Sequence, residues 1–186
     1  MDGSGKRYRL GLVVGRFQTL HKGHEELIRS ALDVCDSVGI FIGSSQESGT
    51  EKNPFSYGLR RMMIESVFGD SVEIAPLPDI GVGNTCAWGD YVMRSAERCF
   101  GRLPDLLVSG TEGRRASWLD REKYPSAEEL FIPKNIDISA SRMRRYLVRG
   151  DREKWERYVS PGVASLYGVL REAALASAGH TDSSSI

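Results

Sequence analysis

The chain has 186 residues, and its 25 basic and 25 acidic residues give a formal net charge of zero. This length suits one globular domain, and the absence of surplus positive charge excludes a general binder of DNA or RNA. No apolar run approaches the ~20 residues of a membrane-spanning helix, and the N-terminus lacks the apolar segment of a signal peptide. Its 3 cysteines form no CxxC pair, so we expect neither a disulfide framework nor a zinc site. These features predict a cytoplasmic protein that binds neither membranes nor nucleic acids.

Short apolar segments alternate with amphipathic ones along the chain. The apolar segments predict strands at residues 10–14, 38–43, 72–75, 105–109 and 130–132. The amphipathic segments predict helices at 23–36, 58–68, 90–100, 141–149 and 151–158, and one more helix after Ser160 and Pro161. This alternation predicts an α/β fold, a Rossmann-like doubly wound parallel sheet of about five strands with a C-terminal helical extension.

The predicted fold also limits where a binding site can lie. We expect one domain over residues 7–178, with the helical extension starting at about residue 151 and disordered ends at 1–6 and 179–186. Ligands of doubly wound sheets bind outside the carboxyl ends of the strands. The segments that follow the strands are therefore the places to look for functional residues.

The segment after the first strand is rich in groups that bind phosphate. It reads GRFQTLHKGH and opens a helix, whose N-terminus favours an anion together with the charges of Arg16 and Lys22. Gly23 lets a ligand approach the backbone, and the imidazoles of His21 and His24 can donate hydrogen bonds to phosphate oxygens. The segment predicts a polyphosphate cradle, although the string alone also suits a helix start with solvated histidines.

GRFQTLHKGH resembles the first signature of the HxGH nucleotidyltransferase superfamily, and it is most similar to that of the archaeal-type nicotinamide-nucleotide adenylyltransferases. The resemblance covers about residues 8–158, and Thr19 stands where the family usually has proline. It implies that His21 and His24 are catalytic. It also implies a nucleotide-binding set in this segment: Gly15, Arg16, Phe17, Gln18, Lys22 and Gly23.

A second signature lies in the segment ISASRMRRYL, which is predicted to start a helix after the last strand. Ser139 or Ser141 can cap this helix, and Arg144 then projects from its first turn toward a bound anion. An ordinary capped helix with solvated arginines is the alternative. The segment resembles the ISxTxxR-like signature of the same superfamily, which implies that Arg144 binds the leaving β- and γ-phosphates. It further implies that Ile138, Ser139 and Ser141 contact the nucleotide.

The segment SGTEGRR follows the fourth predicted strand. The family places a small Ser-Gly turn near the nucleotide here, so the resemblance adds Ser109 and Gly110 to the nucleotide-binding set. Arg114 and Arg115 either contact phosphate or are solvated.

Two further segments, GSSQ…EKNPFS and PDIGVGNTCAW, resemble the acceptor side of the family. The resemblance implies that Ser44 lies near bound substrate and that Lys52 replaces an arginine frequent in the family. An Asn84 side chain can read a carboxamide, and a Trp88 indole can stack on a pyridinium ring. The spacing from Asn84 to Trp88 is one residue longer than in the archaeal pattern, and a core tryptophan is the alternative.

The resemblance implies a nucleotidyltransferase that converts ATP and nicotinamide mononucleotide to NAD and pyrophosphate. Mg²⁺ is expected to be held by phosphates and water, with no metal ligand from the protein, and the family allows a homo-oligomer. Thr19, Lys52 and the longer Asn84–Trp88 spacing keep a second hypothesis open, a CTP-dependent cytidylyltransferase that acts on another small phosphate or phosphonate. A third hypothesis is a nucleotide-sensing module without catalysis.

Overall fold

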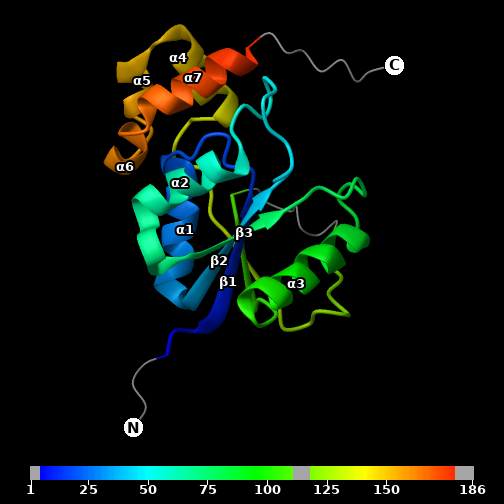
Figure 1. The fold of residues 1–186 in the computed structure, drawn as a ribbon. Helices are drawn as coiled ribbons and strands as arrows, with labels where there is room; N and C mark the ends of the chain where they lie inside the picture. The colour runs from blue at the N-terminus through cyan, green and yellow to red at the C-terminus, as the bar shows by residue number, and fades with distance from the viewer. Residues whose placement is uncertain (1–4, 111–117, 179–186) are drawn as a thin grey trace.

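The centre of the computed structural model, which describes residues 5–110 and 118–178, is a parallel β-sheet (Figure 1). It has five strands in the order β3-β2-β1-β4-β5, and each neighbouring pair is parallel. The strands are β1 (Tyr8–Gly15), β2 (Cys35–Gly43), β3 (Glu73–Leu77), β4 (Leu106–Ser109) and β5 (Glu128–Phe131). The predicted Rossmann-like sheet is confirmed.

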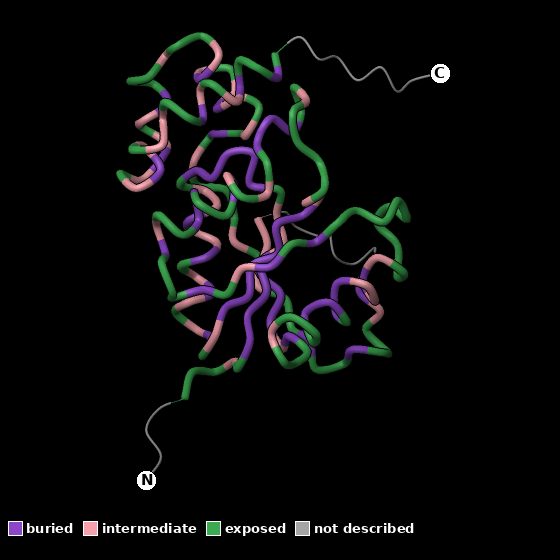
Figure 2. The backbone as a smooth tube through the Cα atoms, viewed as in Figure 1, coloured by how far each residue is buried: buried purple, intermediate pink, exposed green. Residues whose placement is uncertain are grey.

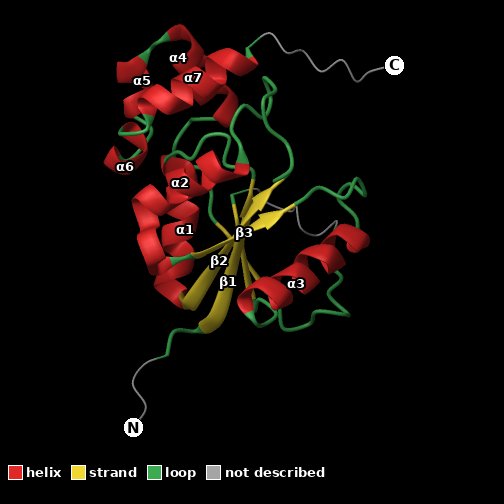
Figure 3. Cartoon of the chain, viewed as in Figure 1, coloured by secondary structure: helices red, strands yellow, loops and turns green. Residues whose placement is uncertain are grey.

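Helices cover both faces of this sheet. Figure 3 shows α1 and α2 on one side and α3 on the other, with the C-terminal helices packed beyond α2. The helices are α1 (Lys22–Val34), α2 (Tyr57–Phe68), α3 (Cys86–Phe100), α4 (Ala140–Arg149), α5 (Arg152–Glu156), α6 (Pro161–Ala164) and α7 (Tyr167–Ser177), with a short 3₁₀ turn, η1 (Gly69–Ser71), after α2. None of the helices in the two described ranges is long and apolar enough to cross a bilayer.

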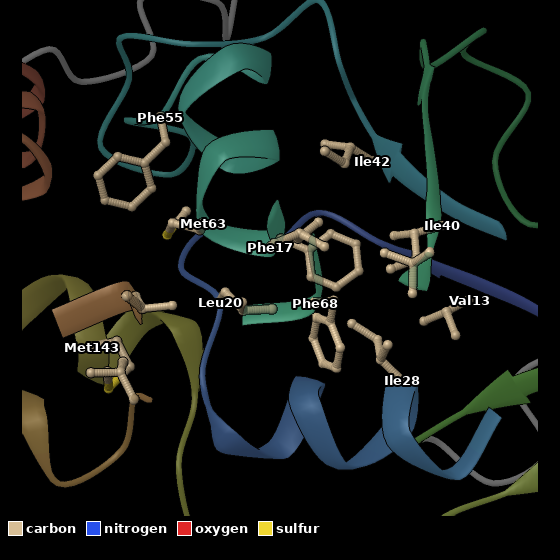
Figure 4. Close-up of a cluster of buried hydrophobic side chains, with 14 of the residues drawn as sticks. Val13, Phe17, Leu20, Ile28, Ile40, Ile42, Phe55, Met63, Phe68 and Met143 are labelled. Carbon is tan, nitrogen blue, oxygen red and sulfur yellow. The ribbon is translucent and has the colours of Figure 1, made fainter. Parts of the chain in front are cut away.

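The apolar side chains form two cores, one on each face of the sheet. Figure 2 shows that buried residues occupy much of the central strands. The larger core lies on the face that α1 and α2 cover. In it, Ile28 of α1, Met63 of α2 and Met143 of α4 belong to one buried cluster (Figure 4). Trp155 of α5 belongs to the same cluster and is fully buried. Each such side chain stabilises the fold by about 1.5–3 kcal/mol, so the C-terminal extension is part of this core.

The observed elements differ from the predicted ones at identifiable residues. Cys35, which we expected on the first helix, has extended backbone angles and begins β2 directly. Pro76, which we expected to end the third strand, lies within β3. β3 is at the edge of the sheet, where proline is tolerated because one row of N–H groups has no partner strand.

Two of the predicted helices also begin or end at other residues than expected. α3 begins at Cys86, four residues before the predicted start, although Gly89 disfavours a helix there. A Cβ atom at Gly89 would lie 1.9 Å from the Trp118 carbonyl oxygen, so close packing requires the glycine. The single helix predicted after Ser160 is two helices, α6 and α7. The ends predicted to be disordered fall largely outside the described residues, as do Arg114 and Arg115.

Candidate active site

The candidate site lies at the carboxyl ends of β1 and β4, the two strands between which the sheet order reverses. β1 and β4 are neighbours in the sheet, but the chain leaves β1 through α1 on one face and reaches β4 from α3 on the other. Ligands of doubly wound sheets bind at such a switch point, beyond the carboxyl ends of the strands. Gly15 ends β1 and Ser109 ends β4. A Cβ atom at Gly110 would lie 3.6 Å from the Leu27 side chain, so the segment after β4 packs against α1, the helix that the first segment opens.

The first loop, residues 16–21 between β1 and α1, is buried along most of its length. Phe17, Gln18 and Thr19 are at most 3% exposed. The Gln18 side chain donates to the Phe55 carbonyl (3.1 Å) and accepts from the Phe55 N–H (3.0 Å). This reciprocal pair fixes the first loop against the NPF segment. The Gln18 side chain, which we expected to contact nucleotide, is thus directed at the protein backbone.

His21 and His24 form a stacked pair at the start of α1. Their ring centroids are 3.9 Å apart with planes inclined by 22°, and Phe17 packs edge-on against His24 at 5.1 Å. A Cβ atom at Gly23 would lie 3.2 Å from the His21 ring, so a larger residue at this position would crowd the ring. The Nδ1 atoms of both rings are buried and have no hydrogen-bond partner in the described ranges. Two adjacent orphan nitrogens at a helix N-terminus are suited to an anionic ligand.

Both imidazoles are neutral at neutral pH. Burial lowers the pKa of His21 to about 4, with a further contribution from the positive charge of Lys134. Burial, the His21 ring and Lys134 together lower the pKa of His24 well below its ordinary value. A neutral ring still offers one N–H donor. A polyphosphate next to the pair would raise both pKa values, because negative charge favours the protonated ring.

Two lysines near the histidines differ from the sequence-based expectation. Lys134, which the motifs did not indicate, follows β5, and its charge acts on both rings. Lys22, expected in the phosphate cradle, donates its ammonium to the Arg157 carbonyl (2.9 Å). The Lys22 N–H also donates to the Tyr158 carbonyl (2.8 Å). The structure thus uses Lys22 to attach α1 to the C-terminal extension.

Glu25 attaches the same turn of α1 to the extension. Its carboxylate is 4% exposed and accepts hydrogen bonds from both the N–H and the hydroxyl of Ser160. The first turn of α1, which carries His24, is therefore held by the segment between α5 and α6. The sequence separation is 135 residues, so no local pattern indicates this contact.

Arg60 of α2 is a second residue that the motifs did not indicate. It is fully buried, and burial lowers its pKa. Its Nη1 donates to the carbonyls of Arg16 (3.2 Å) and Gly43 (2.8 Å). Its other donors reach the carbonyls of Ser44, Ser45, Glu47 and Ser56. One guanidinium thus joins the loop after β1 to the loop after β2.

The second signature meets the first loop through Arg144. Ser139 caps α4 by accepting from the Arg142 N–H (3.3 Å), and Ile138 beside it is buried. Arg144 Nη1 donates to the Gln18 carbonyl (2.6 Å), and Nη2 donates to the Ser141 hydroxyl (3.3 Å). Burial lowers the Arg144 pKa, as does the charge of Arg16, so these two guanidiniums face one region. The two signatures, 126 residues apart, form one cationic site.

The predicted acceptor residues occupy two separate surfaces. Ser44 follows β2 in a left-handed conformation (φ 45°) and Lys52 lines a cavity with Ser141 and Arg144. Asn84 is exposed in the loop before α3, and Trp88 is half-buried in the first turn of α3, 5.5 Å from the Tyr91 ring. Lys52 therefore lies near Arg144 of the second signature. Asn84 and Trp88 lie instead at the start of α3.

The donor set of the site fits a metal ion that arrives with phosphate. No group of three or more His, Cys, Asp or Glu side chains in residues 5–110 and 118–178 could hold a metal. Mg²⁺ prefers oxygen ligands and keeps several waters, so phosphate oxygens can supply its ligands here.

Comparison with known proteins agrees with this geometry. The cytidylyltransferase-like family model matches residues 12–151. A nicotinamide-nucleotide adenylyltransferase of Pyrococcus furiosus is 34% identical over 169 residues, which is 87% of this chain and 84% of that protein. The protein of the same name from Saccharolobus solfataricus is 42% identical over 130 residues, or 62% of this chain and 74% of the relative.

Solved structures show the same fold. The bifunctional NMN adenylyltransferase/ADP ribose pyrophosphatase of Francisella tularensis, complexed with AMP and a manganese ion, superposes with a TM-score of 0.73 at 24% identity. The match covers 91% of this chain but only 52% of that protein, so the chain spans about half its length. The breadth of the family match and the identity to the archaeal enzymes lead to one conclusion: the chain belongs to the cytidylyltransferase-like family of nucleotidyltransferases, and within it is similar to the archaeal nicotinamide-nucleotide adenylyltransferases.

Proposed function

We propose that this chain transfers the adenylyl group of ATP to nicotinamide mononucleotide, which yields NAD and pyrophosphate. The observation that carries the proposal is the stacked pair of His21 and His24, whose buried Nδ1 atoms have no partner in the described ranges. Arg144 reaches the same loop by its bond to Gln18. Relatives that carry the name of this activity are 34% identical to the chain over 87% of its length.

The reaction requires positioning and charge stabilisation more than a covalent intermediate. An oxygen of the acceptor phosphate forms a bond to the α-phosphorus of ATP. At the same time the bond to the bridging oxygen of the β-phosphate breaks, and pyrophosphate leaves with the electron pair. The attacking oxygen is already anionic and needs no general base. The site has to align the two phosphates and stabilise the charge that develops.

The proposed roles combine the resemblance of the two signatures to those of the family with the meeting of both signatures at the first loop. His24 donates to oxygens at the reacting phosphorus, and His21 holds the neighbouring phosphate. Arg144 binds the β- and γ-phosphates with its planar fork. Arg16 and Lys134 add positive charge from the loops after β1 and β5.

Other residues bind the two substrates or shape their site. The residues proposed to contact the nucleotide directly are Gly15, Phe17, Gly23, Ser109, Gly110, Ile138, Ser139 and Ser141. Gln18 and Lys22 act through the backbone contacts of their side chains, which fix the first loop and α1. Ser44, Lys52, Asn84 and Trp88 serve the acceptor. The proposed catalytic unit comprises residues 7–178.

The proposal includes Mg²⁺, bound by the triphosphate and water, which neutralises phosphate charge when present. Its substrates are cytoplasmic metabolites, so the proposal includes a cytoplasmic location. It includes no nucleic-acid or membrane partner. A homo-oligomer is compatible with it.

A substrate matrix tests the proposal. The purified chain is incubated with Mg²⁺ and either ATP or CTP, together with nicotinamide mononucleotide, an alkyl phosphate or an alkyl phosphonate. Pyrophosphate release and NAD formation are both measured. We expect equal amounts of NAD and pyrophosphate only from ATP with nicotinamide mononucleotide. Turnover of CTP with another acceptor, but not of that pair, would establish the cytidylyltransferase alternative. Nucleotide binding without any turnover would establish the sensing module.

A further inference from the structure

The first turn of α1 carries the stacked pair of His21 and His24, but the two side chains do not fix this turn themselves. His21 is the N-cap residue and forms no side-chain capping bond. The buried Nδ1 atoms of both rings have no hydrogen-bond partner in residues 5–110 and 118–178. The position of the pair therefore depends on the backbone of this turn and on the contacts that hold that backbone.

Two neighbouring side chains, Lys22 and Glu25, attach the turn to the C-terminal extension. They are three residues apart and lie on one side of the helix, next to the side that carries the histidines. Lys22 donates through its backbone N–H to the Tyr158 carbonyl and through its ammonium to the Arg157 carbonyl. Glu25 accepts from the N–H and the hydroxyl of Ser160. Four hydrogen bonds thus join one helical turn to one short segment of the extension.

Glu25 makes the most directional of these contacts. Its side chain is buried, Oε1 accepts from the Ser160 N–H at 3.3 Å, and Oε2 accepts from the Ser160 hydroxyl. Arg29 Nη2 approaches Oε2 to 3.9 Å from the next turn of α1. Burial of a carboxylate costs free energy unless such donors are present, and bonds to a charged acceptor are stronger than neutral ones. Two donors on one residue therefore fix both the distance and the orientation of α1 relative to Ser160.

Stability alone does not explain why a buried carboxylate stands at this position. Val163, three residues after Ser160, is fully buried in the larger core and already holds α6 by packing. Apolar groups of the same shape can replace a buried hydrogen-bonded pair at little cost. A fully satisfied polar pair instead specifies one arrangement of the elements that it joins. The element joined here is the turn that carries His24.

We propose that Glu25 is a positioning residue for His24, and that Ser160 of the C-terminal extension holds Glu25 in that role. The inference rests on the proposed function for the chemistry of His24. A displacement of about 1 Å in a group that contacts the transition state can lower the rate about 10²-fold. The extension thus takes part in catalysis without contact with either substrate.

The kinetic test compares Glu25→Leu with a control that disturbs only packing. Glu25→Leu removes both acceptor atoms, so we expect kcat for NAD formation to fall about 10–100-fold. The KM for nicotinamide mononucleotide should stay near its wild-type value. Val163→Ala is the matched control, because it removes buried volume from α6 and leaves both Ser160 bonds in place. Rates are measured well below the Tm of every variant, so that each chain is folded.

Milder variants keep the test decisive if Glu25→Leu does not fold. Ser160→Ala loses the hydroxyl but keeps the N–H, and its kcat should fall about 2–10-fold, as for the loss of one hydrogen bond. Ser160→Thr keeps both the hydroxyl and the preference for the N-cap position, and should have the wild-type kcat. Glu25→Gln keeps an amide oxygen as acceptor, so its kcat should lie between those of the wild type and Glu25→Leu.

A spectroscopic measurement tests the position of the rings without turnover. The proton–carbon NMR spectrum of the histidine rings contains signals of His21, His24 and His180, the three histidines of the chain. Stacked aromatic rings shift the signals of each other. We expect Glu25→Leu to move the signals of His21 and His24 toward those of free histidine, with the His180 signal as the internal reference.

The outcomes separate this inference from the proposed function. Shifted His21 and His24 signals in Glu25→Leu, but not in Val163→Ala, would support the positioning role even if ATP and nicotinamide mononucleotide gave no NAD. Unchanged signals, or equal changes in the two variants, would overturn it even where NAD is formed. With NAD formed, a wild-type kcat in Glu25→Leu, or an equal fall in Val163→Ala, would also overturn it.

Discussion

The first loop and the acceptor loop, residues 78–85, lie at the same edge of the sheet but are built in opposite ways. The first loop is buried and is fixed by Arg60, Phe55 and Arg144. The acceptor loop is exposed along most of its length, and its contact with the loop after β2 is a mutual pair between Gln46 and Asp79. Phosphate chemistry demands atoms held in place before substrate arrives, whereas an exposed loop can adapt to its ligand. The following predictions test this contrast, in order of decreasing expected effect.

Loss of His24 should have the largest effect. We expect His24→Ala to lower kcat about 10²–10³-fold, the range for removal of one donor to a developing charge. His24→Asn keeps an N–H donor and should lose less. Thermal melts of both variants report whether the fold is kept. A wild-type kcat in a folded His24→Ala variant would remove this residue from the catalytic proposal.

Loss of Arg60 should act on stability. Arg60→Met deprives the carbonyls of Arg16, Gly43 and four further residues of a donor in a buried place. We expect the free energy of unfolding in urea to fall by about 3–5 kcal/mol.

Arg61→Met is the matched control for Arg60. Arg61 is the next residue of α2, is exposed and pairs with Glu65 at 2.7 Å. Its replacement should cost no more than about 0.5 kcal/mol. Similar losses in the two variants would contradict the role given to Arg60.

The low pKa of His21 predicts a pH-dependent stability. In the folded chain this ring stays neutral down to about pH 4, whereas its ordinary pKa is 6.5. Between these values the unfolded chain binds more protons. The free energy of unfolding should therefore fall as the pH falls, by up to about 1.4 kcal/mol per pH unit for this group.

Urea unfolding between pH 4 and 8 measures this dependence. His21→Gln cannot titrate, so the difference between its slope and that of the wild type is the part due to His21. Equal slopes would show that the ring titrates alike in the folded and unfolded chain.

The acceptor side should show the smallest effect. We expect Trp88→Leu to raise the KM for nicotinamide mononucleotide about 3–10-fold by loss of a stacking surface. The KM for ATP should stay near its wild-type value. Trp88→Phe retains a ring and should recover part of the loss. An increase in the KM for ATP alone would place Trp88 on the nucleotide side instead.

Local patterns were sufficient to predict the fold and the position of the first loop. Alternating apolar segments predicted the five strands, and the two signatures predicted that residues around His24 and Arg144 serve one site. The structure brings these segments into contact through the Gln18 carbonyl.

What the sequence did not indicate depends on distant contacts. Gly89 disfavours a helix by local propensity, yet it lies within α3, where the nearby Trp118 carbonyl leaves no room for a side chain. Arg60 resembles any arginine on a helix until six carbonyls converge on it.

The contact between Glu25 and Ser160 affects when the site can fold during synthesis of the chain. A ribosome adds Ser160 long after the histidines, 135 residues beyond Glu25. Until that residue leaves the exit tunnel, the first turn of α1 lacks the hydrogen bonds that hold it. The histidine pair can therefore reach its final arrangement only after Arg157 and Ser160, which bond to Lys22 and Glu25, have been synthesised.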